Sequence, residues 1–338
     1  MYKYNNWKMN KVLLKEVLSI PTISQEEDLM RDYIVAFAIK NNITYKIDNK
    51  GNTYLTKGMG KMTQGEYYPC VVSHIDTVHT NHSNFIKNNE RLLISEEEGV
   101  LTAYNPDNEK QTGIGGDDKC GVFVCLSILE HFDVIKAAFF VEEEIGMKGS
   151  KEADEEFFNN VGYAIQFDAP SDNWVSEVCS GVKLFDAEFK SHITKILSEG
   201  GYTKFSVDPF TDVNQLAQKF DFNCLNLGCG YYKQHTDKEY VVIKEVENSL
   251  KMGVSLIDYL GIKEYIHHKE TKKDLLVERD WGKQFKNYDI ECYDEYDEYD
   301  ECANDIVDAV IEMIANGHNH QDIKYEIGEM LFSKNIFK

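Results

Sequence analysis

The sequence predicts an α/β fold: a three-layer sandwich around a mixed, mainly parallel β-sheet, with a small helical appendage near the C-terminal end. Two observations predict this class. From about residue 9 to residue 262, short apolar runs alternate with segments whose apolar residues recur at helical spacing. Several of these runs are apolar throughout, as strands covered on both faces are. The 338 residues, 42% of them hydrophobic, are enough to bury a large core.

The first expected elements are two helices within residues 9–43, separated at Pro21, whose ring fixes φ and removes a backbone donor. A β-hairpin is expected over residues 44–58, with its turn at Gly51 and Asn52. Further along the chain, strands are expected at residues 67–76, 136–144 and 161–170, with a helix at 120–132.

The same rhythm continues after residue 174 without a long irregular gap. Strands are expected at residues 180–185, 202–207 and 223–230, and helices at 187–201, 212–220 and 238–261. These elements extend the same sheet, so residues 1–262 are predicted to form one domain.

The composition changes after residue 262. Residues 263–302 run through a charged stretch into the acidic repeat YDIECYDEYDEYDEC, which predicts a linker or exposed loop. Loose calcium binding, or binding of a basic protein partner, is the alternative for this repeat. Two short amphipathic helices are expected within residues 303–338, where they would form the C-terminal appendage.

The charge of the chain excludes some partners. Its formal net charge is −22, and its only arginines are Arg31, Arg91 and Arg279, so nucleic acids and anionic membrane surfaces would be repelled. No apolar segment is long enough to span a membrane, and the N-terminal residues lack the apolar stretch of a signal peptide, so a cytoplasmic location is expected. The eight scattered cysteines are then expected to be reduced thiols.

Four of the predicted strands lead into residues that can bind metal, and a glycine-rich segment before a helix adds two more carboxylates. Because the carboxyl ends of parallel strands line one edge of a sheet, these side chains should converge. So many carboxylates would repel one another unless cations lie among them. Imidazole and carboxylate ligands favour zinc, with manganese or cobalt as substitutes, and the number of ligands suits two divalent ions. The converging residues are His74, Asp76, Asp117, Asp118, Glu142, Glu143, Glu144, Asp168 and His235.

Five segments in a fixed order carry a resemblance to a known family. SHIDTV, GGDDKCG, EEEIG, QFDAP and QHTDKEYV resemble the metal-site motifs of the dinuclear zinc exopeptidases typified by peptidase T, aminoacylase and glutamate carboxypeptidase. The N-terminal segment LLKEVLSIPTIS and the segment FTDVNQLAQKFDFNCLNLGCG are also similar to peptidase T-like proteins. The match spans about residues 10 to 260, so the resemblance implies a zinc exopeptidase-like catalytic domain over residues 1–262.

The resemblance implies a role for each matching residue. The metal ligands would be His74, Asp117, Glu144, Asp168 and His235, with Asp117 bridging two ions. Asp76 would orient the His74 imidazole, and Asp118 would lie beside the bridging residue. Glu143 would be the general base, taking a proton from a metal-bound water so that the resulting hydroxide attacks an amide carbonyl.

The sequence also departs from the peptidase T pattern. Those enzymes insert a lid and dimerisation domain between the fourth and fifth ligands, whereas only 66 residues separate Asp168 from His235, so the lid is expected to be missing. The substrate would then be held by other groups: its amine by Asp172 or Glu142, and its oxyanion by Tyr231 or Tyr232. His79 and His82 are expected to lie in an exposed loop.

These observations predict a hydrolase that cleaves a terminal amide bond in small peptides, as an aminopeptidase does. A deacylase of N-acylated amino acids would use the same metals and is the enzymatic alternative. The alternative of another class is a non-catalytic interaction protein that binds a protein partner through its acidic C-terminal region.

Overall fold

The computed structural model describes residues 9–208 and 210–269, which belong to one compact unit. The acidic repeat and the expected C-terminal appendage, within residues 270–338, lie outside the described residues. Predictions made for those segments therefore remain predictions.

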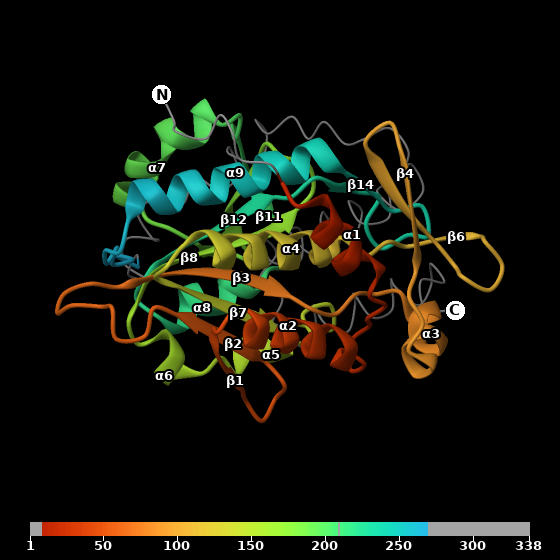
Figure 1. The fold of residues 1–338 in the computed structure, drawn as a ribbon. Coiled ribbons are helices and arrows are strands. Elements are labelled where there is room, and N and C mark those ends of the chain that lie inside the picture. Colours follow the sequence, from red (N-terminus) through yellow and green to blue (C-terminus); the bar gives the residue numbers. More distant parts are fainter. Residues whose placement is uncertain (1–8, 209, 270–338) are drawn as a thin grey trace, which may run out of the picture. The chain divides into compact units, whose positions relative to one another are not determined.

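Nine strands form the main sheet, and its centre is parallel, which confirms the predicted class (Figure 1). The four central strands lie in the order β7, β3, β8, β12, and each is parallel to its neighbour. They span Ile135–Phe140 (β7), Tyr68–His74 (β3), Val161–Ala169 (β8) and Asn223–Gly228 (β12). The carboxyl ends of these four strands therefore share one edge of the sheet.

Shorter strands complete the sheet on both sides of this parallel centre. On one side lie β2 (Thr53–Lys57) and β1 (Thr44–Ile47), the predicted hairpin, which joins antiparallel to β7. On the other side β9 (Trp174–Cys179) runs antiparallel to β12 and pairs with both β10 (Val182–Lys183) and β11 (Lys204–Asp208). β9 was not predicted, and the strand expected over residues 180–185 is reduced to the two residues of β10.

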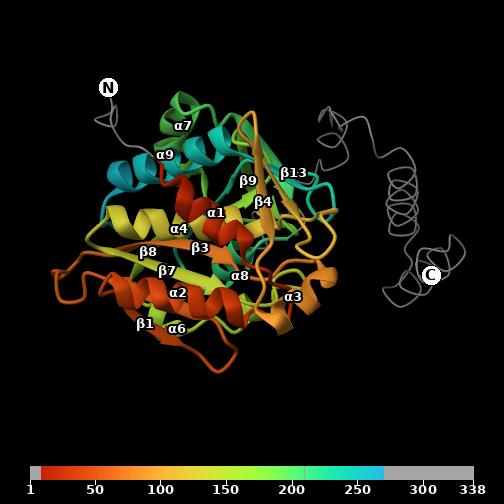
Figure 2. The same ribbon diagram turned by 45° about the vertical axis from the view of Figure 1, so that its right-hand side comes forward.

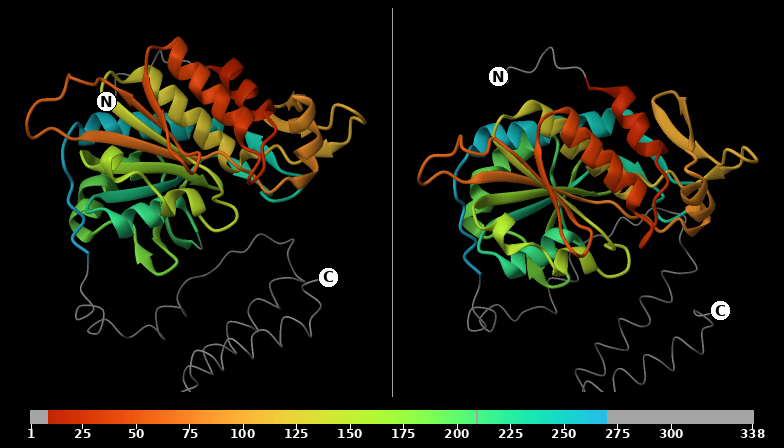
Figure 3. Two further views of the ribbon diagram at one scale, coloured as in Figure 1. Left: turned by 90° about the horizontal axis from the view of Figure 1, so that it is seen from below. Right: turned by 60° about the horizontal axis from the view of Figure 1, so that its bottom comes forward.

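Helices cover both faces of the sheet, as Figures 1, 2 and 3 show. α4 packs on β3 and β8 on one face, with α1 and α9 against it, while α8 packs on β12 from the other face. Residues 120–129 of α4 are apolar apart from Ser127, so this part of the helix can be buried on every side. The helices of the main layers are α1 (Lys11–Ser19), α2 (Asp28–Lys40), α4 (Gly116–His131), α5 (Lys148–Lys151), α6 (Glu155–Phe158), α7 (Ala187–Glu199), α8 (Asp212–Lys219) and α9 (Ile243–Leu260).

A second, five-stranded sheet was not predicted, and it lies beyond the carboxyl end of β3 (Figure 1). It contains β4 (Leu93–Glu97), β5 (Val100–Tyr104), β6 (Gln111–Thr112), β13 (Tyr231–Tyr232) and β14 (Tyr240–Val242), and a short helix, α3 (Ser83–Asn88), precedes it in the chain. β14 corrects the prediction of one helix from residue 238. Tyr240, Val241 and Val242 favour a strand and pair there, and the helix begins only at Ile243.

Two further observations bear on the expectations from composition. No helix of the described residues is long and apolar enough to cross a membrane. Six of the eight cysteines lie in the described part of the chain, and all six are free and buried, which agrees with the expectation of reduced thiols: Cys70, Cys120, Cys125, Cys179, Cys224 and Cys229.

Candidate metal centre

The predicted ligands converge at the carboxyl edge of the parallel strands. His74 is the last residue of β3, and Asp168 is the penultimate residue of β8. Glu143 and Glu144 lie in the turn after β7, and Asp117 is the second residue of α4. His235 lies in the loop between β13 and β14. Five separate segments of the chain therefore meet at one place, as the strand order requires.

The five predicted ligands form two triads that share Asp117. In the first triad His74 Nε2 lies 3.1 Å from Asp117 Oδ1 and 3.6 Å from Asp168 Oδ1. In the second triad His235 Nε2 lies 3.3 Å from Asp117 Oδ2 and 3.2 Å from Glu144 Oε2. Each oxygen of Asp117 thus faces a different histidine, which is the geometry of a bridging carboxylate.

The residues present fit a pair of divalent cations. Within each triad the ligand atoms lie within 4.8 Å of one another, and each triad offers one imidazole nitrogen and two carboxylate oxygens. This donor set suits zinc, manganese or cobalt. Glu144 Oε1 is buried and has no hydrogen-bond partner among the described residues, so it has an unused lone pair.

The electrostatics of the cluster also favour a cation. Burial raises the pKa of Glu144 to about 7 and the pKa of Asp168 to about 6, and repulsion from the Asp117 carboxylate adds to both shifts. Hydrogen bonds to Asp117 and Glu144 raise the pKa of His235 to about 11. Burial alone would disfavour the His74 cation, but the surrounding carboxylates outweigh burial and hold the pKa of His74 well above its usual range. The cluster therefore attracts positive charge, which divalent ions would supply.

Asp76 contacts three segments of the site through its buried carboxylate. Oδ1 accepts the backbone N–H of Glu143 at 3.0 Å and lies 3.4 Å from His74 Nδ1. Oδ2 accepts the N–H of Glu144 at 3.2 Å and the Ser24 hydroxyl at 2.7 Å. His74 Nδ1 also lies 3.1 Å from the Asp76 carbonyl oxygen. Asp76 can therefore orient the imidazole and also holds the turn that carries two glutamates.

Asp118 binds the end of β3 instead of facing the triads. Its Oδ2 accepts the Ser73 hydroxyl at 2.7 Å and the His74 N–H at 3.2 Å. Its Oδ1 accepts the N–H of Gly121 inside α4. The peptide bond between Asp117 and Asp118 is cis. Gly115, just before them, has φ +66°, and glycine adopts this left-handed conformation without strain.

Glu143 lies beside the triads without belonging to either of them. Only 8% of the residue is exposed, and burial holds the pKa of its carboxyl well above the usual range, with Asp168 and Asp212 adding repulsion. A buried carboxylate with a raised pKa accepts a proton more readily than a solvated one. Burial near the triads and a raised pKa are properties that a general base requires.

The three predicted substrate-binding residues differ in where their side chains lie. The Tyr231 hydroxyl donates to Asp168 Oδ1 at 3.2 Å, so it reaches the first triad. The Tyr232 hydroxyl donates instead to Glu245, and Asp172 accepts a hydrogen bond from Asn248. Glu142, the other residue considered for a substrate amine, accepts from Lys50 at 2.7 Å and lies 3.4 Å from Lys148, so its charge is already paired.

The prediction of an exposed loop for His79 and His82 is wrong. His79 is 7% exposed and His82 is fully buried, because residues 77–82 pack between the glycine loop before α4 and the second sheet. His79 Nε2 lies 2.8 Å from Glu239 Oε2, a carboxylate that sequence reasoning overlooked. Glu239 lies within the motif QHTDKEYV, four residues after His235, but the motif alone points to no role for it.

Two more buried polar residues adjoin the site and were not predicted. Gln166 on β8 donates to Asp168 Oδ2 at 3.3 Å and lies 3.5 Å from Asp212 Oδ2. Asp212, the first residue of α8, is fully buried, and its Oδ1 has no partner among the described residues. Burial raises the pKa of Asp212 to about 7. Gln166 lies in the motif QFDAP and Asp212 in the segment FTDVNQLAQKFDFNCLNLGCG, but the sequence analysis gave neither residue a role.

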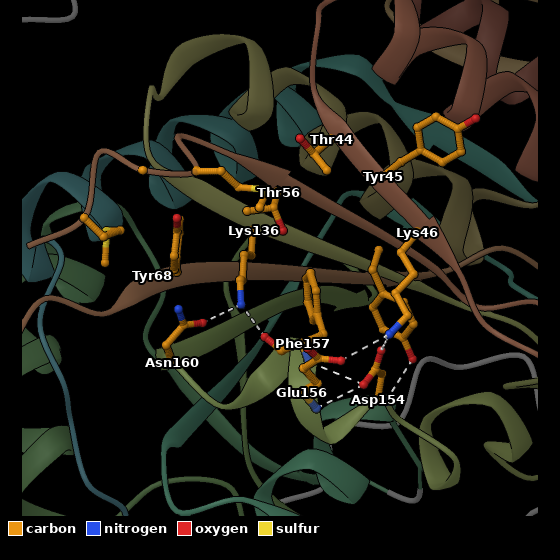
Figure 4. Close-up of a pocket in the computed structure, with 14 residues that line it drawn as sticks. Thr44, Tyr45, Lys46, Thr56, Tyr68, Lys136, Asp154, Glu156, Phe157 and Asn160 are labelled. Carbon is orange, nitrogen blue, oxygen red and sulfur yellow. Dashed lines mark hydrogen bonds and ion pairs between the residues drawn. The ribbon is translucent and has the colours of Figure 1, made fainter.

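A pocket of about 440 Å³ lies elsewhere, where β3 and β7 begin (Figure 4). Lys136 at its wall donates to the Phe157 carbonyl and to Asn160 Oδ1, and its ammonium lies 5.0 Å from the centre of the Tyr68 ring. The Lys136 ammonium therefore holds the turn of residues 157–160 in place, and this structural role explains why a lysine is buried there. The pocket contains none of the predicted ligands and lies at the opposite end of the strands from them.

No protein-family model matches the chain, and no curated protein matches it by sequence. Solved structures nevertheless share its fold. Aminopeptidase PepT from Bacillus cereus is 13% identical with a TM-score of 0.58, over 75% of this chain and 99% of that one. A tripeptidase from Staphylococcus aureus is 14% identical with a TM-score of 0.55, over 74% and 98%. The TET1 peptidase from Pyrococcus horikoshii is 16% identical with a TM-score of 0.53, over 73% and 98%.

At these identities the likeness shows a shared fold. All three of these solved proteins are named as peptidases, and the fold they share is the one that the sequence motifs predicted.

Proposed function

We propose that this protein is a metal-dependent exopeptidase that uses two divalent ions, with zinc as the proposed metal, to hydrolyse a terminal amide bond in small peptides. The observation that carries the proposal is the pair of triads sharing Asp117, whose two oxygens face His74 and His235 separately. Peptidases with the same fold support this activity over the others considered.

The proposed ligands are those of the triads, with His74 and Asp168 on one ion, Glu144 and His235 on the other, and Asp117 between them. When bound, the two ions would polarise the amide carbonyl and make a water molecule more acidic. Glu143 would accept a proton from the attacking water and then donate it to the leaving nitrogen. Asp76 would keep the His74 ring and the backbone of Glu143 in fixed positions relative to each other during both proton transfers.

Tyr231 is the best-placed of the predicted substrate-binding residues. Its hydroxyl already lies 3.2 Å from Asp168 Oδ1, so it is within reach of a substrate held at the first triad. A phenol there could donate a hydrogen bond to the developing oxyanion. We assign no substrate contact to Tyr232 or Asp172, whose side chains bind Glu245 and Asn248.

We propose an aminopeptidase rather than a deacylase because the solved peptidases of this fold include an aminopeptidase and a tripeptidase. A cytoplasmic location is proposed with it, on the six free cysteines of the described residues. The proposed substrate is a small peptide, and an N-acylated amino acid is the alternative substrate.

The test is metal analysis of the purified full-length protein followed by a substrate screen. We expect about two equivalents of divalent metal per chain and release of free amino acids from unblocked dipeptides and tripeptides. Cleavage of N-acetylated amino acids in place of unblocked peptides would establish the deacylase. Hydrolysis that persists in the Glu143→Gln variant at the wild-type rate would contradict the proposed mechanism.

A further inference from the structure

Glu239 is a buried carboxylate that the proposed chemistry does not use. It is 0% exposed, follows His235 by four positions and directly precedes β14. Oε1 accepts the backbone N–H of Asp117 at 3.1 Å, and Oε2 accepts the N–H of Gly115 at 2.7 Å. Oε2 also lies 2.8 Å from His79 Nε2. Every one of these partners belongs to a segment next to a proposed metal ligand.

Three ligand-bearing segments meet at this carboxylate. His79 follows His74 in the loop after β3, Gly115 precedes the bridging Asp117, and Glu239 itself lies in the loop of His235. The glycine loop has little freedom at this point, because a Cβ on Gly113 would lie 1.9 Å from His79 Cε1. The imidazole therefore packs directly on the backbone of the loop that it helps to hold.

From these contacts we propose that Glu239 is a positioning residue of the metal centre. Its carboxylate fixes the backbone of Asp117 relative to the His235 loop, and His79 fixes Glu239 in turn. The interaction needs a carboxylate, since both oxygens must accept hydrogen bonds at once. A glutamine at this position would place an amide N–H₂ against at least one backbone N–H, and two donors cannot bond to each other.

The inference rests on the proposed function, because Asp117 matters as a bridge only if metal binds. Residues that orient metal ligands from behind contribute about 10- to 100-fold to metal affinity. We therefore expect Glu239→Gln to weaken zinc binding by about that factor while Asp117, His74 and His235 all remain in the chain.

The experiment compares zinc affinity, by competition with a chelating dye, with amide hydrogen exchange of residues 113–117 in the full-length protein. Asp186→Asn is the matched control, because Asp186 also accepts two backbone N–H groups, from Phe189 and His268, but lies before α7, away from the triads. His79→Leu is the second variant. It removes one of the three contacts to Glu239 and so provides a milder test if Glu239→Gln fails to fold.

We expect weaker zinc binding and faster exchange of residues 113–117 in Glu239→Gln, a smaller change of both in His79→Leu, and no change of either in Asp186→Asn. Wild-type zinc affinity in Glu239→Gln, or an equal loss in the control, would overturn the inference. If the wild-type protein itself binds no zinc, the proposed function fails. The exchange measurement still tests whether Glu239 holds the loop, because unchanged exchange in both Glu239→Gln and His79→Leu would refute that role.

Discussion

The burial of Asp212 predicts an unusual pH dependence of stability, and replacing it with asparagine should remove that dependence. Asp212 is fully buried at the start of α8, and its Oδ1 has no partner among the described residues. Burial raises the pKa of Asp212 from 3.8 to about 7. The folded protein therefore keeps a proton on this carboxyl over a pH range in which the unfolded chain has released it.

The sign follows from the direction of the shift. For a carboxyl whose folded pKa is raised, stability is greatest below the unfolded pKa and is lost as the pH rises towards the folded pKa. Between about pH 5 and about pH 9 this single group should lower the free energy of unfolding by about 3 kcal/mol, at about 1.4 kcal/mol per pH unit up to the folded pKa. The Asp212→Asn variant carries no ionisable group there, so it should not lose this amount.

The assay is urea denaturation of wild type and Asp212→Asn, followed by circular dichroism across this pH range with a chelator present. Taking the difference between the two proteins cancels the contributions of their other carboxyl groups. As the pH rises from about 5 to about 9, the free energy of unfolding of the variant should increase by about 3 kcal/mol relative to that of the wild type. Added zinc should reduce this difference, because nearby cations favour ionised Asp212. A difference that stays constant across the range refutes the assignment of a raised pKa to Asp212.

Three further predictions concern the site itself. Glu143→Gln should lower kcat by about 100- to 10,000-fold because it cannot accept a proton, whereas its zinc content, measured by plasma mass spectrometry, should equal that of wild type; loss of zinc would instead make Glu143 a ligand. His74→Ala should reduce the bound zinc, because it removes the imidazole of the first triad, and an unchanged stoichiometry in the same measurement would exclude His74 as a ligand. Tyr231→Phe should lower kcat with little change in KM if the hydroxyl binds the oxyanion, as steady-state rates on a dipeptide would show; an increase in KM alone would indicate ground-state binding.

Much of the fold could be predicted because the signals were local. The parallel strands are continuous apolar runs, and the sequence motifs alone place His74, Asp168 and Glu144 at or just after the ends of these runs. The second sheet could not be predicted in the same way. β4 is almost entirely exposed, β5 is only half-buried, and β14 is three residues long, so their pairing depends on distant partners and not on their own composition.

Candidate metal ligands could be predicted from the sequence, whereas the residues that only hold the backbone around them could not. His74 and Asp117 are recognisable by residue type and spacing. Glu239 and His79 are ordinary surface residue types in sequence, and only the tertiary contact between them, 160 positions apart, reveals that they are buried. Asp212 is similar, since an aspartate in the first turn of a helix is normally solvated, whereas here it is fully buried.

Three carboxylates behind the triads hold the segments of the chain that carry the proposed ligands. Asp76 holds the backbone of the turn after β7, Asp118 holds the end of β3, and Glu239 holds the loop before α4, each by hydrogen bonds to a different segment of the chain. These segments also pack against one large hydrophobic core. Small zinc domains differ, because their folding free energy comes largely from the metal. In this protein the core and these hydrogen bonds position the proposed ligands, so the proposed metal binding would not have to supply the folding free energy.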